Sequence, residues 1–167
     1  MTGLAFLGLV MLIVMLGAIF IGVPISLLGL RAEHRFAVIE MGANHQGEIA
    51  HLMSIAEPTI GIVTNAGAAH LEGFGSLQGV ASGKGEMFRG LPHDGVAVIN
   101  ADDAFAPYFA ERAHGRTLLR FGIEANADIR ARDIEQDAIG SRFVLVTPQG
   151  EAEVTLALPG RHNVRNA

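Results

Sequence analysis

Four short apolar runs, each bounded by turn residues, constrain the fold of this chain more than any other feature. The predicted strands are FAVIEMG (Phe36–Gly42), IGIVTN (Ile60–Asn65), GVAVIN (Gly95–Asn100) and TLLRFG (Thr117–Gly122). Apolar residues at helical spacing predict helices between them, over His45–Glu57, over Leu77–Leu91, and from a cap at Asp102 or Asp103 to Gly115. Apolar strands that alternate with helices are typical of a parallel α/β sheet, in which ligands gather at the carboxyl ends of the strands.

The pattern changes after the fourth run. Three further strands are predicted over Asp128–Ile134, Arg142–Thr147 and Glu153–Leu158, joined by short turns. The last of them, EVTLAL, alternates between polar and apolar residues, as a half-buried strand does. We therefore predict an α/β fold with a mostly parallel sheet flanked by helices and a small antiparallel β appendage. The chain then stops at LPGRHNVRNA, where a new helix is expected to begin.

Composition narrows the class of partner. A length of 167 residues allows one domain with a real core. The net charge of −5 and the absence of a basic run argue against nucleic acid. Because the chain has no cysteine, any metal must be held by oxygen or imidazole ligands. The lack of cysteine is also compatible with a cytoplasmic protein.

The N-terminal segment has a different character. Residues Met1–Leu30 include no charged side chain, and Gly3–Gly22 is an unbroken run of apolar residues and glycine. This run is long enough for a transmembrane helix. Three interpretations remain open: a membrane anchor, a buried helix, or a non-native start. We accordingly divide the chain into an apolar segment, residues 1–20, and a domain, residues 21–167.

Candidate functional residues cluster at the expected strand ends. Glu40 and Asn65 end two strands, His70 lies in the next loop, and Lys84, the only lysine, lies on the apolar stripe of a helix. Lysine at such a position usually extends its ammonium group to the rim of the core. The alternative is a desolvated amine with a lowered pKa. Glu40 and His70 could bind a divalent ion, and a lysine carbamate would add oxygen ligands of the kind that Mg²⁺ prefers.

Other patterns in this region are weaker. Spacing alone favours scattered structural residues over a metal site, and capping alone over a role in chemistry for the NADD run (Asn100–Asp103). The nearest match to the phosphate-loop motif is Gly83-Lys84-Gly85, which lacks both the first glycine and the final serine or threonine. The density of glycine between Gly73 and Gly85 predicts a loop that handles a ligand.

Five segments of the sequence resemble the Mur ligases of peptidoglycan synthesis. They are IGVPISLL, EHRFAVIEMGANHQGEI, IVTNAGAAHLEGFGSLQGVASGKGEMF, GVAVINADD and LPGRHNVRNA. Within the family they are most similar to the ligase that adds D-Ala-D-Ala to UDP-MurNAc-tripeptide. The resemblance covers Ile21–Ala167 and implies an incomplete central ATP-binding domain of the P-loop type. Folylpolyglutamate synthetases share the general order of motifs but differ from this chain in the sequences of these segments.

The resemblance implies a reaction and roles for particular residues. ATP would phosphorylate the tripeptide carboxylate, and the amine of D-Ala-D-Ala would then attack the acyl phosphate. Glu40, His70 and Lys84, the last as its carbamate, would bind Mg²⁺. Asn166 would contact the adenine, with Asn163 and His162 nearby.

The departures from the family pattern lead to further expectations. The family's phosphate loop is absent, and the apolar residues Met1–Phe20 stand in its place. Backbone N–H groups of such a loop supply much of the grip on phosphates. We therefore expect that this chain alone neither binds ATP tightly nor turns over. The alternatives are a membrane-anchored, non-catalytic remnant that binds a partner, or another amide ligase of the superfamily.

Overall fold

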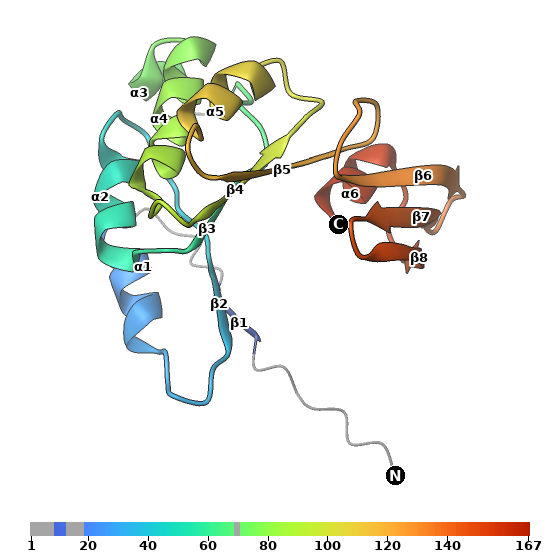
Figure 1. Ribbon diagram of the computed structural model, residues 1–167, viewed down its shortest axis with the longest axis horizontal. Helices are drawn as coiled ribbons and strands as arrows, with labels where there is room; N and C mark the ends of the chain where they lie inside the picture. Colours follow the sequence, from blue (N-terminus) through green and yellow to red (C-terminus); the bar gives the residue numbers. More distant parts are fainter. Residues whose placement is uncertain (1–8, 13–18, 69–70) are drawn as a thin grey trace.

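One mixed six-stranded sheet, with the strand order β3-β4-β5-β6-β7-β8, is the central element of the fold (Figure 1). The computed structural model describes residues 9–12, 19–68 and 71–167. Strands β3 to β6 run parallel to one another, and β6 to β8 are antiparallel. The predicted fold class, a mostly parallel sheet with an antiparallel appendage, is confirmed.

The parallel part consists of β3 (Ile60–Val63), β4 (Val96–Asn100) and β5 (Thr117–Gly122). Three helices pack on one face of it: α2 (Glu48–Ala56), α4 (Leu77–Gly90) and α5 (Ala106–Arg112). The rings of Phe88 on α4 and Phe109 on α5 meet edge to face, 5.9 Å apart, and both side chains are almost fully buried. This contact anchors the larger core, since aromatic pairs add to the free energy of burial.

The opposite face of β3 is open. Because side chains alternate along a strand, Gly61 and Val63 face the helices, whereas Ile60 and Ile62 point the other way. Val63 is 5% exposed, but Ile60 and Ile62 are 56% and 52% exposed. The described residues therefore leave an apolar sheet surface uncovered.

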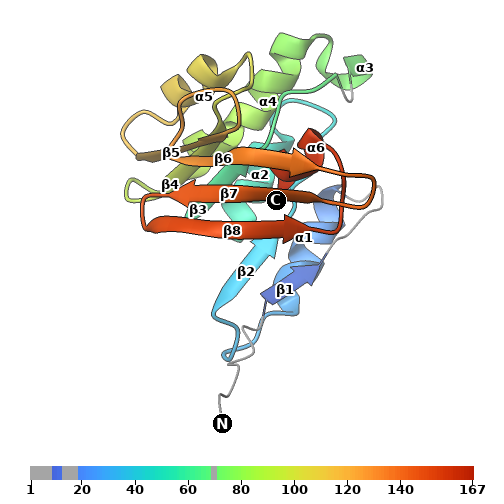
Figure 2. The ribbon, with the colours of Figure 1, turned by 90° about the vertical axis from the view of Figure 1, so that its right-hand side faces the viewer.

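The antiparallel part has a core of its own. It consists of β6 (Ile129–Gln136), β7 (Ser141–Thr147), β8 (Gly150–Leu156) and the short helix α6 (Arg161–Asn166). Ala131, Phe143 and Val164 form its buried centre. Only two residue pairs, Phe121↔Ile129 and Gly122↔Arg130, join β5 to β6. Figure 1 accordingly shows these strands set apart from the helices that cover the parallel part, and Figure 2 shows β6, β7 and β8 running side by side.

The N-terminal segment differs from its prediction. Leu9–Leu12 form strand β1, which pairs in parallel with β2 (Phe36–Ile39) in a separate two-stranded sheet. The prediction of a continuous transmembrane helix over Gly3–Gly22 is therefore wrong at Leu9–Leu12. The physical reason is that an unbroken apolar run suits a parallel strand as well as a helix. A ten-residue helix, α1 (Ile19–Leu28), follows. Among the described residues, no helix combines the length and apolar character needed to cross a bilayer.

Helix boundaries differ in smaller ways from those predicted. Helix α2 begins at Glu48 rather than His45, and it ends at Ala56, before Glu57 takes a left-handed conformation with φ of 43°. A short helix, α3 (Leu71–Phe74), lies within the predicted loop 66–76. Helix α5 ends at Arg112, three residues before Gly115. Prediction placed α2 and α5 correctly and their ends less well, and it did not include α3.

Candidate functional site

Lys84 reaches the carboxyl end of β3 from the middle of α4. Its Nζ donates a hydrogen bond of 2.7 Å to the carbonyl oxygen of Asn65, two residues beyond the strand. Val80 and Phe88, one turn away on either side, are buried, and Lys84 is half-buried between them. Burial lowers the pKa of the Lys84 amine, and the negative charge of Asp103 opposes that shift. The site therefore contains a partly desolvated amine aimed at the strand ends.

Asp103 ties the ends of β3 and β4 together. Its Oδ2 accepts a hydrogen bond of 2.7 Å from the Ala66 N–H, and its Oδ1 accepts one of 2.7 Å from the Phe105 N–H. The first bond fixes the loop that follows β3, and the second bond shapes the turn before α5. The prediction that the NADD run serves capping alone is therefore wrong. Two acidic residues just beyond the end of a buried strand were the sequence signal for this role.

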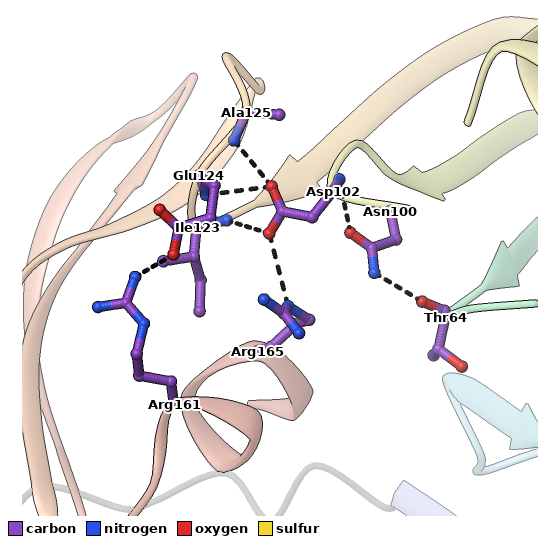
Figure 3. A network of polar contacts seen from close by, with 8 residues as sticks. All are labelled: Thr64, Asn100, Asp102, Ile123, Glu124, Ala125, Arg161 and Arg165. Carbon is purple, nitrogen blue, oxygen red and sulfur yellow. Dashed lines mark hydrogen bonds and ion pairs between the residues drawn. The ribbon is translucent and has the colours of Figure 1, made fainter. Parts of the chain in front are cut away.

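Asp102, the neighbour of Asp103, holds a different loop (Figure 3). Its carboxylate accepts hydrogen bonds from the N–H groups of three consecutive residues, Ile123, Glu124 and Ala125, at 2.8, 3.0 and 2.7 Å. Its Oδ2 also lies 3.5 Å from Nε of Arg165. The amide of buried Asn100 extends the network, since its nitrogen donates to the carbonyl oxygen of Thr64 and its oxygen accepts from the Asp102 N–H. Nothing in the sequence periodicity indicates these long-range bonds.

The loop that follows β2 is organised by Glu48. Its Oε2 accepts hydrogen bonds from the N–H groups of Asn44 and His45, and its Oε1 lies 3.2 Å from Nδ1 of His45. The Asn44 N–H bond chiefly lowers the pKa of the Glu48 carboxyl. From α4, Glu86 accepts hydrogen bonds from the Gly47 and Ala50 N–H groups. These bonds fix the loop against α4.

The structure places the other predicted metal ligands only in part. Glu40 directly follows β2 and is exposed, so its carboxylate is solvated and needs no partner within the chain. His70 lies outside the described residues. Among the residues that the structure describes, no group of three His, Cys, Asp or Glu side chains is gathered as a metal site. Lys84 and Asn65 are brought together, whereas no hydrogen bond or ion pair among the described residues joins Glu40 to them.

The predicted adenine-binding residues all belong to α6. His162 and Asn166 are exposed, and Asn163 is partly buried with its side-chain nitrogen 2.7 Å from the carbonyl oxygen of Pro159. Helix α6 begins after Gly160, whose φ is 104°. Two exposed polar side chains and one anchored amide thus lie on a single short helix.

Glycines of the central segment allow neighbouring segments to pack closely. A Cβ at Gly79 or Gly83 of α4 would clash with Phe74 of α3, and one at Gly73 would clash with the carbonyl oxygen of Asn44. The glycine-rich stretch therefore lets three segments approach closely. The structure thus gives these glycines a packing role, and the prediction of a loop that handles a ligand stays a prediction.

A cleft of about 780 Å³ lies between α2 and α4. None of the predicted site residues lines it; the lining residues are Ala50, Met53, Ser54, Glu57, Glu86, Arg89, Gly90 and Pro92. The candidate site therefore consists of the strand ends around Lys84 and the helix α6.

Comparison with known sequences identifies the Mur ligases. The family model of the Mur ligase middle domain matches residues 19–167. The UDP-N-acetylmuramoyl-tripeptide–D-alanyl-D-alanine ligase of Escherichia coli K12 is 50% identical over 148 residues, which are 88% of this chain and 33% of the relative. The ligase of the same name from Haemophilus influenzae is 46% identical, over 88% of this chain and 32% of the relative.

Solved structures that are similar to this chain include Mur ligases. MurF from Acinetobacter baumannii matches with a TM-score of 0.81 at 40% identity, over 86% of this chain and 31% of its own. MurF from Thermotoga maritima, in complex with ADP, matches with a TM-score of 0.69 at 28% identity, over 80% of this chain and 31% of its own. The chain thus spans about a third of the length of the relatives that it matches.

Proposed function

Since this chain belongs to the Mur ligase family by its match to the middle domain, we propose that it is the central part of a MurF-type ligase. Such a ligase joins D-Ala-D-Ala to UDP-MurNAc-tripeptide. Relatives at 46% and 50% identity bear that name, and they favour this substrate over those of other amide ligases. We place the ATP-binding region in residues 21–167.

The observation that carries this proposal is the placement of Lys84. Carbamylation requires the neutral amine, and burial lowers the pKa of Lys84 and so raises its neutral fraction. The amine lies at the carboxyl ends of parallel strands, where ligands of such sheets bind. A carbamate at this point would present two oxygens beside the loop that leads to His70.

The residues fit a magnesium site on the chemistry of their donor groups. Glu40, His70 and carbamylated Lys84 would hold Mg²⁺ through oxygen and imidazole. Bound Mg²⁺ supplies positive charge that offsets the charge on the phosphates of ATP. Asn166, with Asn163 and His162, would contact the adenine from α6.

The proposed reaction has two steps. The tripeptide carboxylate attacks the γ-phosphorus of ATP, which forms an acyl phosphate and releases ADP. The amine of D-Ala-D-Ala then attacks the acyl carbon, an amide bond forms, and inorganic phosphate leaves with the proton lost from the amine. In this scheme the chain's own residues bind the nucleotide, while the peptide substrates are held by the whole ligase.

A carbamate on Lys84 can be tested directly because the chain has only one lysine. We expect a carbamate signal in ¹³C NMR when the chain is equilibrated with ¹³C-bicarbonate, and loss of that signal in Lys84→Met. The only other primary amine is the chain's α-amino group, which Lys84→Met retains as an internal control. A parent chain without the signal, or a variant that keeps it, would contradict the assignment.

Catalysis by this chain alone is expected to be absent. The sequence contains no G-x-x-x-x-G-K-[ST] motif to grip the phosphates. Phosphate release from ATP should therefore stay at background when the purified chain is mixed with UDP-MurNAc-tripeptide, D-Ala-D-Ala and Mg²⁺. Release that depends on both substrates and disappears in Lys84→Met would show instead that the chain is a complete catalyst.

A further inference from the structure

The polar ties between α6 and the parallel part of the sheet converge on Asp102 (Figure 3). Arg165 of α6 lies 3.5 Å from its Oδ2. Arg161, one helical turn earlier, forms an ion pair with Glu124, whose own N–H donates to Oδ1 of Asp102. Both arginines of α6 are therefore linked to this carboxylate, one directly and one through Glu124.

The Asp102 carboxylate is suited to this task. Its side chain is 8% exposed. Burial raises the pKa of the carboxyl, but the N–H groups of Ile123, Ala125 and Glu124, together with the Arg165 charge, hold the pKa below its ordinary value. The approach is close, since a Cβ on Gly122 would lie 2.9 Å from Oδ1. Asp102 is thus a buried anion held between two parts of the molecule.

The remaining connection between those parts is small. Two residue pairs join β5 to β6, and the two hydrophobic cores share no buried residue. Val164 packs α6 into the smaller core, so α6 is attached to the antiparallel strands. Its position relative to the parallel strands accordingly depends on the polar contacts that converge on Asp102.

We propose that Asp102 is a positioning residue for the nucleotide: it fixes α6 relative to the strand ends at which Lys84 lies. The inference rests on the proposed function, because it takes α6 as the adenine side of the site and Lys84 as the phosphate side. The adjacent residues Asp102 and Asp103 have different structural roles. Asp103 orders the loop after β3, and Asp102 sets where α6 stands relative to that loop.

Distance measurements between spin labels test the structural half. The chain has no cysteine, so labels attach only at cysteines introduced by Glu111→Cys on α5 and Ala167→Cys after α6. We expect a narrow distance distribution in the otherwise unaltered chain and at least a twofold wider one after Asp102→Asn. Asp103→Asn is the matched control, because its hydrogen bonds stay within the parallel part, and it should keep the narrow distribution.

An unchanged distribution in folded Asp102→Asn would overturn the proposal. If that variant fails to fold, as judged by circular dichroism, Arg165→Gln decides, since it removes the direct contact between α6 and Asp102 and leaves the bonds from Ile123, Glu124 and Ala125 in place. Widening in Arg165→Gln supports the proposal, and an unchanged distribution overturns it.

Nucleotide titration tests the functional half. With millimolar Mg²⁺ and ADP, we expect amide shifts in ¹⁵N NMR near Asn65 and Lys84 and on α6 in the parent chain. Asp102→Asn should keep the first set and lose the second, a split that general destabilisation would not produce. Retention of the α6 shifts would overturn the proposal. No shifts in the parent chain would contradict the proposed function, while the label distances would still decide the role of Asp102.

Discussion

At the scale of single residues, Lys84 shows how a proposed functional group can oppose stability. Its stem lies on the buried stripe of α4, and its amine is partly desolvated. The helical periodicity predicted this position, because the stripe could be counted from Leu77 to Leu91. The partners of the amine could not be predicted, since Asn65 and Asp103 reach it through contacts between distant segments.

Lys84→Met should stabilise the chain at pH 7. Methionine keeps the packed stem without a desolvated charge, so we expect a gain of up to about 1 kcal/mol in the free energy of unfolding. The pKa of Lys84 is lowered, so the unfolded chain binds more protons between that pKa and the ordinary value of 10.5. The parent's stability therefore rises with pH across this window, and the advantage of methionine should shrink.

Urea titrations at several pH values, in buffer free of carbon dioxide, measure this difference. Arg89→Met, an exposed position on the same helix, serves as the control. A methionine variant that is less stable at every pH would show that the bond to Asn65 outweighs the cost of burial.

At the scale of elements, α3 and α4 approach closely because α4 has glycine where they meet. Gly79 and Gly83, one turn apart, both face Phe74. Sequence patterns predicted α4 almost to the residue but missed α3, because a four-residue helix has no period to detect. The same limit explains why the packing role of these glycines was not predicted, since it depends on a neighbouring segment.

Gly83→Ala should therefore destabilise the chain, although alanine favours helices by about 1 kcal/mol over glycine. The new Cβ would clash with the Phe74 ring, and overpacking of this kind costs about 1 to 3 kcal/mol. In a Phe74→Ala background the clash is gone, and the same substitution should become stabilising. A double-mutant cycle by urea unfolding measures the change of sign, and additive effects would refute the contact.

At the scale of the whole molecule, one face of the parallel sheet is covered by helices and the other is exposed at β3. Strands of parallel sheets are usually buried on both faces, and their sequences are correspondingly apolar throughout. The run IGIVTN therefore predicted the strand, but it could not predict which face the described residues leave open. A dye that binds exposed apolar surface should accordingly bind the native chain.

Adjacent positions on β3 separate the two faces. Ile62→Ser should reduce dye fluorescence and change the free energy of unfolding by no more than about 0.5 kcal/mol, because Ile62 is 52% exposed. Val63→Ser, at a position that is 5% exposed, should cost about 2 to 3 kcal/mol and leave dye binding by the native state unchanged. Equal losses of stability at both positions would show that the open face is covered in solution.

The short junction between β5 and β6 also has a consequence for how the chain unfolds. Strands β6 to β8 pair with neighbours in sequence. Strands β3 and β4 are separated in sequence by α4, so their pairing closes a long segment of chain. Local pairings form quickly, and regions with separate cores open as separate cooperative units. Denaturation of this chain should therefore proceed in two transitions, with the antiparallel strands persisting after the parallel ones have opened. Asp102, which crosses the junction, then governs how strongly the two transitions are coupled.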